Sequence, residues 1–426
     1  MDQTGDREIA GKPVNEQALN IRLLLSSLAF VILLSIVVPA QSSKSAGPAQ
    51  TKQQRKAEAQ RRRAAETELP AEAGAVSTSR LALPFKRVWQ YLTDNATTLS
   101  PSVDEMRIYL PLAGGRVLCL DRVTGALLWT GEPGGIVVAP VSLAENSVYV
   151  ATSKFADDGS ELGGSLRAID KTTGLTVWVK DYPRPFSSPL RQASGKIFAG
   201  SADGSFYALD AKSGEVLWKV ETQDVVRGPA LITDRALYFG GDDGALRAVE
   251  GERGQVIWKF QSAGKIVGQP AGDERAIYFG SADGYVYSVD AQTGKLRWRS
   301  RTGAAVEAAP VITGDRVLVA SFDNFIYALA RSTGDRIWKR RLENRITSAP
   351  IVEGDASLVA PLRGDYVAVF RNEDGRRLNL YQLEKDFEIV ADPIYTNGAL
   401  VVPTSRGLVV ATVPLMKDAQ TRAVKK

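Results

Sequence analysis

The seven tryptophans of this 426-residue chain lie on a regular grid along the sequence. Successive gaps are 40, 49, 40, 40, 40 and 40 residues, which a random distribution would not produce. A fixed period near 40 residues indicates one structural unit repeated many times, so length alone is a poor guide to the number of domains. The grid consists of Trp89, Trp129, Trp178, Trp218, Trp258, Trp298 and Trp338.

The repeated unit reads as a set of short strands. Two clear copies run from Ser201 to Trp218 and from Ser281 to Trp298. Each has an alternating apolar run, an Asp-x-x-Thr/Ser-Gly turn and a segment that carries the tryptophan. Such runs predict antiparallel strands, and Gly supplies the positive φ that tight turns need. The turn residues of the clearest copies are Asp121, Asp170, Asp210 and Asp290 with Gly125, Gly174, Gly214 and Gly294.

A second grid, of prolines, gives the number of units. Proline cannot donate to a strand ladder, so it is expected where strands begin. Four short strands in about 40 residues is the size of a propeller blade. Eight units therefore predict an all-β, eight-bladed β-propeller. The prolines that precede the units are Pro101, Pro140, Pro189, Pro229, Pro270, Pro310, Pro350 and Pro393.

The eighth unit is incomplete at its C-terminal end. Residues Ala391 to Val413 supply about three strands, and no tryptophan segment follows them. The missing strand is predicted at the other end, from Phe85 to Leu92, where it would close the ring and remove the free edges. We assign 81–415 to the propeller and 416–426 to a C-terminal tail. In blade seven, Leu378 is read as the residue that replaces the tryptophan.

The Asp-x-x-Thr-Gly-x-x-x-Trp pattern resembles the repeat of PQQ-type, or quinoprotein-like, eight-bladed propellers. The resemblance covers roughly residues 85–414, and the chain has neither the His nor the Trp-Asp pair of WD40-like propellers. The chain is also similar to the propeller subunit of the outer-membrane β-barrel assembly machinery. That similarity implies a membrane-tethered scaffold for protein–protein interaction with no enzymatic activity. Unlike that subunit, the chain has no Cys after its apolar segment for a lipid anchor.

The resemblance also implies an enzymatic alternative. PQQ-dependent dehydrogenases hold the quinone at the ring centre, with calcium, a catalytic Asp, a stacking Trp and a disulfide between adjacent cysteines. This chain has no His and only Cys119, which excludes His-based catalytic and metal sites and any internal disulfide. We expect no catalytic residue, cofactor or metal. A quinoprotein dehydrogenase and an extracytoplasmic ligand-binding sensor remain the alternatives.

Carboxylates recur at a second turn of successive blades. Turn formation explains this recurrence better than a metal site, because the same residue type returns at the same place in each unit. The four positions are Asp203, Asp243, Asp283 and Asp323.

An apolar segment precedes the propeller. Residues 1–20 form an N-terminal tail, and 21–40 form a transmembrane anchor or a signal segment. As a helix, residues 21–38 would span about 27 Å, close to the roughly 30 Å of a hydrocarbon core. The sequence Val38-Pro39-Ala40 resembles a small-residue cleavage site, so a cleaved, secreted form is the alternative.

Residues 41–80 form a basic low-complexity tether with eight Lys/Arg and four Asp/Glu. The segment has too few bulky apolar residues to bury a core. Its basic part, 44–63, would retain the propeller in the cytoplasm by the positive-inside rule. Resemblance to exported proteins favours a periplasmic propeller, which we expect. We also expect this part to contact anionic lipid, and no nucleic acid to bind, because the ring is nearly neutral.

Three departures from the repeat indicate a binding surface, because broken repeats are where function tends to appear. They are a nine-residue excess in blade two, the connection from Tyr182 to Phe186, and the segment from Arg376 to Phe387. Aromatic and Arg side chains dominate protein interfaces. We therefore predict a protein partner on the face of the blade-two insertion, with Lys265, Glu307 and Arg345 nearby. The predicted contact residues are Phe155, Tyr182, Arg184, Phe186 and Arg227.

Overall fold

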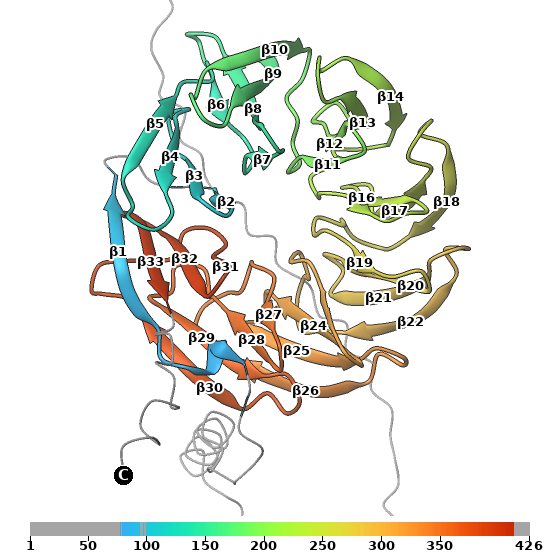
Figure 1. Cartoon of the computed structure of the whole chain (residues 1–426). Coiled ribbons are helices and arrows are strands. Elements are labelled where there is room, and N and C mark those ends of the chain that lie inside the picture. The colour runs from blue at the N-terminus through green and yellow to red at the C-terminus, as the bar shows by residue number, and fades with distance from the viewer. Residues whose placement is uncertain (1–76, 78, 94–96, 98, 413–426) are drawn as a thin grey trace, which may run out of the picture. The chain divides into compact units, whose positions relative to one another are not determined.

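The computed structural model describes residues 77, 79–93, 97 and 99–412, which form eight antiparallel sheets arranged as a ring of blades (Figure 1). The predicted all-β, eight-bladed propeller is confirmed. Its described helical element is η1 (Arg80–Ala82), and no helix among the described residues is long and apolar enough to cross a membrane. The expected apolar segment at 21–40, most of the tether and the C-terminal tail lie outside the described residues.

Each of the first four blades is built from consecutive strands. Blade 1 contains β2 (Ser102–Val103), β3 (Arg107–Pro111), β4 (Val117–Asp121) and β5 (Leu127–Gly131). Blade 2 contains β6 (Ile136–Val137), β7 (Ser142–Leu143), β8 (Ser147–Phe155), β9 (Glu161–Asp170) and β10 (Thr176–Tyr182). Blade 3 contains β11 (Arg191–Ala193), β12 (Lys196–Gly200), β13 (Ser205–Asp210) and β14 (Val216–Glu221). Blade 4 contains β15 (Leu231–Ile232), β16 (Leu237–Gly240), β17 (Ala245–Val249) and β18 (Val256–Gln261).

The remaining blades follow the same order until the chain closes on itself. Blade 5 contains β19 (Ala271–Gly272), β20 (Ala276–Gly280), β21 (Tyr285–Asp290) and β22 (Leu296–Arg301). Blade 6 contains β23 (Val311–Thr313), β24 (Arg316–Ser321), β25 (Phe325–Ala330) and β26 (Arg336–Arg341). Blade 7 contains β27 (Ile351–Glu353), β28 (Ala356–Val359), β29 (Tyr366–Arg371) and β30 (Arg377–Gln382). Blade 8 contains β31 (Ile394–Thr396), β32 (Ala399–Thr404), β33 (Gly407–Thr412) and, from the N-terminal side, β1 (Lys86–Leu92).

The N-terminal strand closes the ring as the sequence predicts. β1 pairs antiparallel with β33, from Lys86 opposite Thr412 to Leu92 opposite Gly407. Figure 1 shows β1 lying along the outer side of β33. Blade 8 therefore combines the two ends of the described chain, and the N-terminal strand is the outermost of its four strands.

The ring has two faces that differ in their loops. One face, here the connection face, carries the loops between the second and third strands and the blade-to-blade connections. The other, here the turn face, carries the turns between the first and second strands and the Asp-x-x-Thr-Gly turns between the third and fourth. This division follows from the antiparallel order of strands in every blade.

The hydrophobic core is divided among the seams between blades. Eight clusters of buried side chains exist among the described residues, and each joins two neighbouring blades. The cluster between blades 5 and 6, for example, packs Tyr278 and Trp298 against Val319 and Leu329. Because each sheet is covered on both sides by its neighbours, the ring buries its apolar area without a central core.

The seven tryptophans contact the turn of the following blade. Each indole lies against the turn glycine of that blade, as Trp258 lies on Gly294. Six indole N–H groups donate to the carbonyl oxygen next to the turn Asp position, at 2.9–3.2 Å. The same contact between an indole and a turn thus joins each of these blades to the next. The glycine pairs are 89 with 125, 129 with 174, 178 with 214, 218 with 254, 258 with 294, 298 with 334, and 338 with 375.

Blade 7 differs from the others for a reason that lies in the closure. The position equivalent to Trp338 is Asn379 rather than Leu378, because Asn379 pairs with Val369 as Trp338 pairs with Ala328. The prediction of Leu378 was wrong by one residue. Blade 8 has no turn between its third and fourth strands, since its fourth strand is β1. A tryptophan here would have no turn glycine to cover.

The N-terminal segment occupies the place of that missing turn. The Asn379 side-chain amide donates to the carbonyl oxygens of Leu81 (3.2 Å) and Leu83 (2.6 Å). Leu81 is fully buried in the cluster between blades 7 and 8. The seam at the closure is therefore held by a different set of contacts that serve the same purpose.

The seam contact predicts that a methyl group at a turn glycine is costly. In Gly294→Ala, the new Cβ would lie 2.6 Å from the Trp258 ring, in addition to the strain of a φ of +68°. In the control Gly195→Ala the φ is +73° and the Cβ would meet no atom within 4 Å. We expect the control to cost about 1–2 kcal/mol and Gly294→Ala about 1–3 kcal/mol more.

Denaturant unfolding of both purified variants measures this difference. Equal losses of unfolding free energy would show that the backbone conformation matters and the indole contact does not.

Candidate protein-binding face

The excess residues of blade 2 extend a hairpin on the connection face. β8 and β9 pair from Ser147 and Asp170 out to Phe155 and Glu161, leaving only five residues for the loop. The sequence analysis treated this excess as an insertion between two strands, whereas most of it lengthens the strands themselves. β6 adds to β8 through Ile136 opposite Ser153, which gives blade 2 a fifth strand. Phe155 stands at the end of this hairpin with 47% of its surface exposed.

The connection that follows blade 2 packs directly on the hairpin. The guanidinium of Arg184 forms an ion pair with Glu161 at 2.7 Å. A Cβ on Gly164 would lie 2.4 Å from the Cα of Pro185, so the two segments touch at the backbone. The structure therefore brings Phe155 and Arg184 to one region of the connection face, as the sequence analysis predicted.

Tyr182 and Phe186 lie in the same connection, and their rings pack against each other in the seam. Phe186 is 2% exposed and its ring centroid is 4.7 Å from that of Tyr182. The Tyr182 hydroxyl donates to the carbonyl oxygen of Gly214, and burial raises the pKa of this phenol above its usual range. Both residues pack the seam between blades 2 and 3. The burial of Phe186 argues against its assignment as a contact residue, whereas Tyr182 is only partly buried and its assignment stays a prediction.

The position of Phe186 in the repeat could have shown its role. Residues at 40-residue intervals from Phe186 are apolar and buried, and they fill the seam where each blade begins. Phe186 is the aromatic member of this series, which continues with Val226, Ile266, Val306 and Ile346.

Arg227 belongs to a charged cluster that the sequence analysis did not recognise as a unit. Its Nε lies 2.9 Å from Oδ2 of Asp242, and the Nζ of Lys265 lies 2.7 Å from the same oxygen. The Asp242 side chain is 1% exposed, while both cations are about half exposed. Oδ1 of Asp242 has no hydrogen-bond partner among the described residues. One carboxylate thus positions two cations, and the cluster keeps a net positive charge and spare N–H donors.

The signal for this cluster was present in the repeat. Asp242 stands where blades 3, 5 and 6 have Ala202, Ala282 and Phe322, so blade 4 alone of these has a charge at that position. Farther round the same face, the Arg345 guanidinium lies 4.9 Å from the centroid of the Phe322 ring. A second positive side chain held by another residue therefore lies on this face, separate from the Asp242 cluster.

The recurrent carboxylates of the second turn are held by side chains four residues later. Tyr287 donates its hydroxyl to Asp283 at 2.7 Å, and Tyr207 and Tyr327 donate to Asp203 and Asp323 in the same way. In blade 4 an arginine, Arg247, replaces the tyrosine and pairs with Asp243. These contacts stabilise the turns. Across the described residues, no group of three or more His, Cys, Asp or Glu is placed to hold a metal ion.

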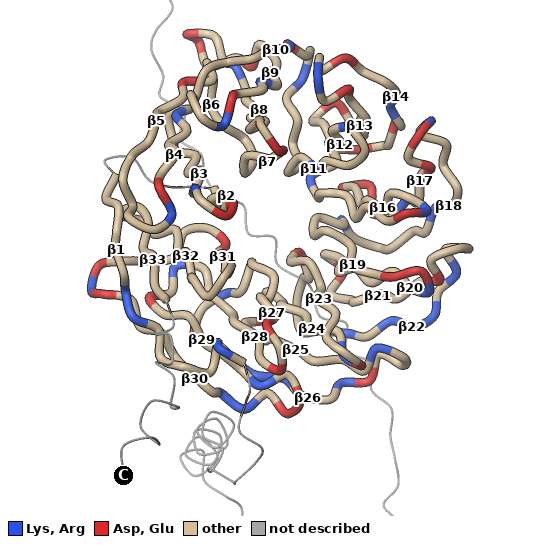
Figure 2. Tube along the Cα trace, in the orientation of Figure 1, with Lys and Arg blue, Asp and Glu red and all other residues tan. Residues whose placement is uncertain are grey.

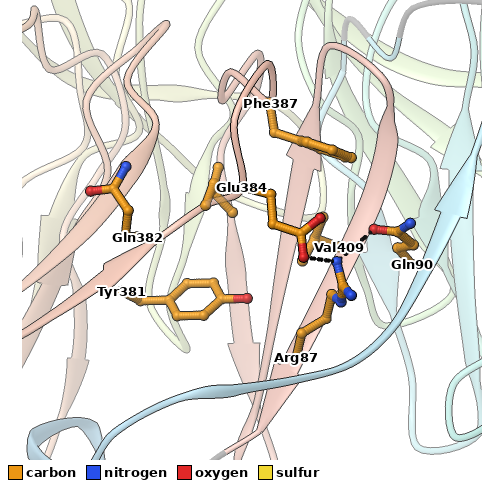
Figure 3. A pocket seen from close by; sticks show the side chains of 8 residues that line it. Arg87, Gln90, Tyr381, Gln382, Glu384, Phe387 and Val409 are labelled. Atoms are coloured by element: carbon orange, nitrogen blue, oxygen red, sulfur yellow. Dashed lines mark hydrogen bonds and ion pairs between the residues drawn. The ribbon is translucent and has the colours of Figure 1, made fainter.

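A small hollow of about 180 Å³ lies elsewhere, at the seam between blades 7 and 8. Figure 3 shows Arg87 of β1 reaching Glu384 and Gln90 across it, with Tyr381 and Phe387 on its walls. The Arg87–Glu384 ion pair is solvent-exposed, and such pairs contribute at most about 1 kcal/mol. The end of the segment from Arg376 to Phe387, which departs from the repeat, lines this hollow, but none of the five predicted contact residues does. The ion pair joins β1 to the end of blade 7.

The propeller region of this chain matches known proteins. Residues 85–185, 162–268 and 242–412 match the family model described as outer membrane protein assembly factor BamB. A curated relative, the outer membrane protein assembly factor BamB of Kangiella koreensis, is 37% identical over 84 residues. That match covers 20% of this chain and 20% of the relative's own length.

Solved structures share the architecture. The crystal structure of BamB from Moraxella catarrhalis superposes with a TM-score of 0.65 at 18% identity, covering 79% of this chain and 99% of that one. The computationally designed Ika8 protein gives a TM-score of 0.64 at 18% identity, covering 76% of this chain and 98% of the design. At these identities the likeness concerns the fold.

Phe186 is buried and Phe155 is exposed, so truncating them to alanine should change the free energy of unfolding by very different amounts. Phe186→Ala should lower the free energy of unfolding by about 3–5 kcal/mol, because it opens a cavity in the seam between blades 2 and 3. Phe155→Ala should change it by no more than about 0.5 kcal/mol, because the side chain is exposed. Equilibrium denaturation of the two variants checks this. Similar losses in both would mean that the Phe155 hairpin is part of the core.

Proposed function

This chain belongs to the outer membrane protein assembly factor BamB family, and on that premise we propose that it is a scaffold in outer-membrane protein assembly. In this role the propeller holds other proteins by surface contact and catalyses no reaction. The proposed location is the periplasm, with residues 21–38 as the membrane anchor and 41–80 as the tether. The observation that carries the proposal is a row of side chains on the connection face of blades 2–5, namely Phe155, Arg184, Arg227 and Lys265, which we call the arc.

This arc has the composition of a protein interface. It offers the exposed ring of Phe155, the guanidinium groups of Arg184 and Arg227, and the ammonium of Lys265. Aromatic and Arg side chains supply most of the binding energy in protein interfaces. The cations still have N–H donors available for carboxylates of a partner. A partner segment with exposed apolar and acidic side chains would match the arc.

The side chains of the arc are held by contacts within the ring itself. Phe155 stands on two paired strands, Arg184 is held by Glu161, and Asp242 holds Arg227 and Lys265. Side chains that are already ordered lose less conformational entropy on association. The preorganised arc therefore favours binding without a change of the ring.

The turn face offers less to a partner. Its Asp-x-x-Thr-Gly turns use their polar side chains internally, as Asp290 accepts from both the amide and the hydroxyl of Thr293. These hydrogen bonds, the hydroxyl of Thr293 first, lower the pKa of Asp290. The remaining surface consists of short, repeated turns. Some of them carry exposed arginines, such as Arg235 and Arg253, but they lack the extended hairpin that presents Phe155.

The start of the described chain leaves the connection face free. Ser77 donates to Asp355 at 2.8 Å and Ser79 donates to Glu353 at 3.0 Å, and both carboxylates lie at the turn face of blade 7. A tether that leads to these residues reaches the ring from the turn face. The proposed anchor would therefore not cover the arc.

The contacts of the tryptophans in the seams give little support to the alternative function, a quinoprotein dehydrogenase. A quinoprotein site needs a tryptophan free to stack on the quinone, and all seven indoles lie on turn glycines. Cys119 is buried, and burial raises the pKa of its thiol to about 12, so the thiolate is not available as a nucleophile.

A test replaces the contact residues in the cells that make the protein. The variant Phe155→Ala/Arg184→Gln/Arg227→Gln should reduce the amount of folded β-barrel protein in the outer membrane to the level of a gene deletion. The reason is that a few central residues carry most interface energy, about 2 kcal/mol or more each. Heat-modifiable mobility of barrel proteins in gels measures the folded amount.

The control is Lys212→Gln, which changes a side chain on the turn face. It should leave barrel assembly at the wild-type level, and the abundance of every variant is checked by immunoblot. Normal assembly in the triple variant, at normal abundance, would contradict the proposed role of the arc.

A further inference from the structure

Two neighbouring edge strands carry an unusual concentration of positive charge. β22 contains three arginines and β26 contains three arginines and a lysine, and neither strand has an acidic residue. Figure 2 shows these basic positions together on the outer side of blades 5 and 6. On β10 and β14, by contrast, Lys180 pairs with Glu215 and Lys219 pairs with Glu221. We call β22 and β26 together the basic rim.

Most cations of the basic rim have no carboxylate partner. Arg297 lies 3.7 Å from Asp290, and the other six form no ion pair with any described residue. Arg299 and Lys339 instead lie over the rings of Tyr285 and Phe325, at 5.0 and 4.4 Å from the centroids. Rings orient these cations without neutralising them. Arg340 donates to the backbone carbonyl oxygens of Asp374 and Gly375. The exposed cations of the rim therefore carry positive charge that no carboxylate neutralises, apart from the long contact of Arg297.

The shape of the rim decides what kind of anion fits it. The two strands are the outermost of their blades, so they run along the convex outside of the ring (Figure 1). Leu296 and Ile337 are exposed beside the arginines, at 49% and 42%. A flat surface of many anionic groups with an apolar layer beneath can meet cations and aliphatic side chains together. A single acidic segment would reach only part of the two strands.

We propose that the basic rim docks the propeller edge-on against a membrane surface through the anionic headgroups of phospholipids. Each guanidinium can donate two hydrogen bonds to one phosphate, which favours Arg over Lys at such a surface. Edge-on docking leaves the connection face exposed to solvent at right angles to the membrane. The proposal rests on the proposed function in one respect only, which is that the protein is located near a membrane.

The test uses the full-length chain in vesicles with a fluorophore on the rim. Leu296→Cys is labelled, since Cys119 is buried and its thiol stays protonated. Vesicles contain phosphatidylcholine alone or with phosphatidylglycerol, plus a quencher attached to lipid headgroups. We expect quenching only with phosphatidylglycerol, and its loss at high salt because salt screens exposed charges. A label at Val216→Cys, the equivalent position on β14, should not be quenched.

Charge reversal on the rim supplies the matched comparison. Arg301→Glu/Arg341→Glu should reduce the ratio of docked to free rings by roughly 30-fold or more, because each cation near an anionic surface contributes about fivefold. Lys180→Glu/Lys219→Glu changes the net charge equally and should dock normally. Both pairs keep the arc on the connection face intact.

Four results would overturn the proposal. Quenching that is equal in neutral vesicles, or equal at Val216, would show contact without charge recognition. If the Arg301→Glu/Arg341→Glu variant docks normally but associates with itself, the role of these cations is to prevent the free strand edges from pairing with another copy of the chain. A label that responds to polyglutamate and not to vesicles would indicate an acidic protein partner. Barrel assembly is scored separately with the arc variant, so either proposal can fail without the other.

Discussion

The contact between an indole and the turn glycine of the next blade is the interaction on which the ring depends. It explains why glycine stands at the turn, where Gly294 has both a positive φ and no room for a Cβ. It also explains the 40-residue period, since each blade must present a tryptophan on one side and a turn on the other. Blades linked only to their neighbours need no shared core, and their loops can vary without loss of the ring.

That freedom is the reason why we propose the connection face as the binding surface. The turn face is committed to the seam contacts, because the indoles and the Asp-bound turns meet there. The connection face carries the extended blade-2 hairpin and the Asp242 cluster, neither of which the seams require. A propeller of the outer membrane protein assembly factor family can therefore hold partners on one face while the other maintains the fold.

Repetition made the fold predictable and made parts of the site unpredictable. The tryptophan and proline grids specify the blade count, and the lone Trp89 strand specifies the closure, because both depend on position along the chain. Phe186 is buried because it occupies the same position in the repeat as Val226 and Ile266. This equivalence is easy to miss, since Phe186 is an aromatic residue in a proline-rich connection. Asp242 becomes meaningful only when folding places two cations from separate connections on one oxygen. The replacement at Asn379 could have been read from the sequence, because the tryptophan of the other blades follows the turn glycine by four residues and Asn379 follows Gly375 by four.

The most direct measurement is site-specific photocrosslinking of the full-length protein in its own cells. A photoreactive amino acid would replace Phe155 on the connection face or Lys212 on the turn face, and mass spectrometry would identify the crosslinked product. The account predicts a product with a component of outer-membrane protein assembly from position 155 and none from position 212. Crosslinking of that component from position 212 alone would contradict it.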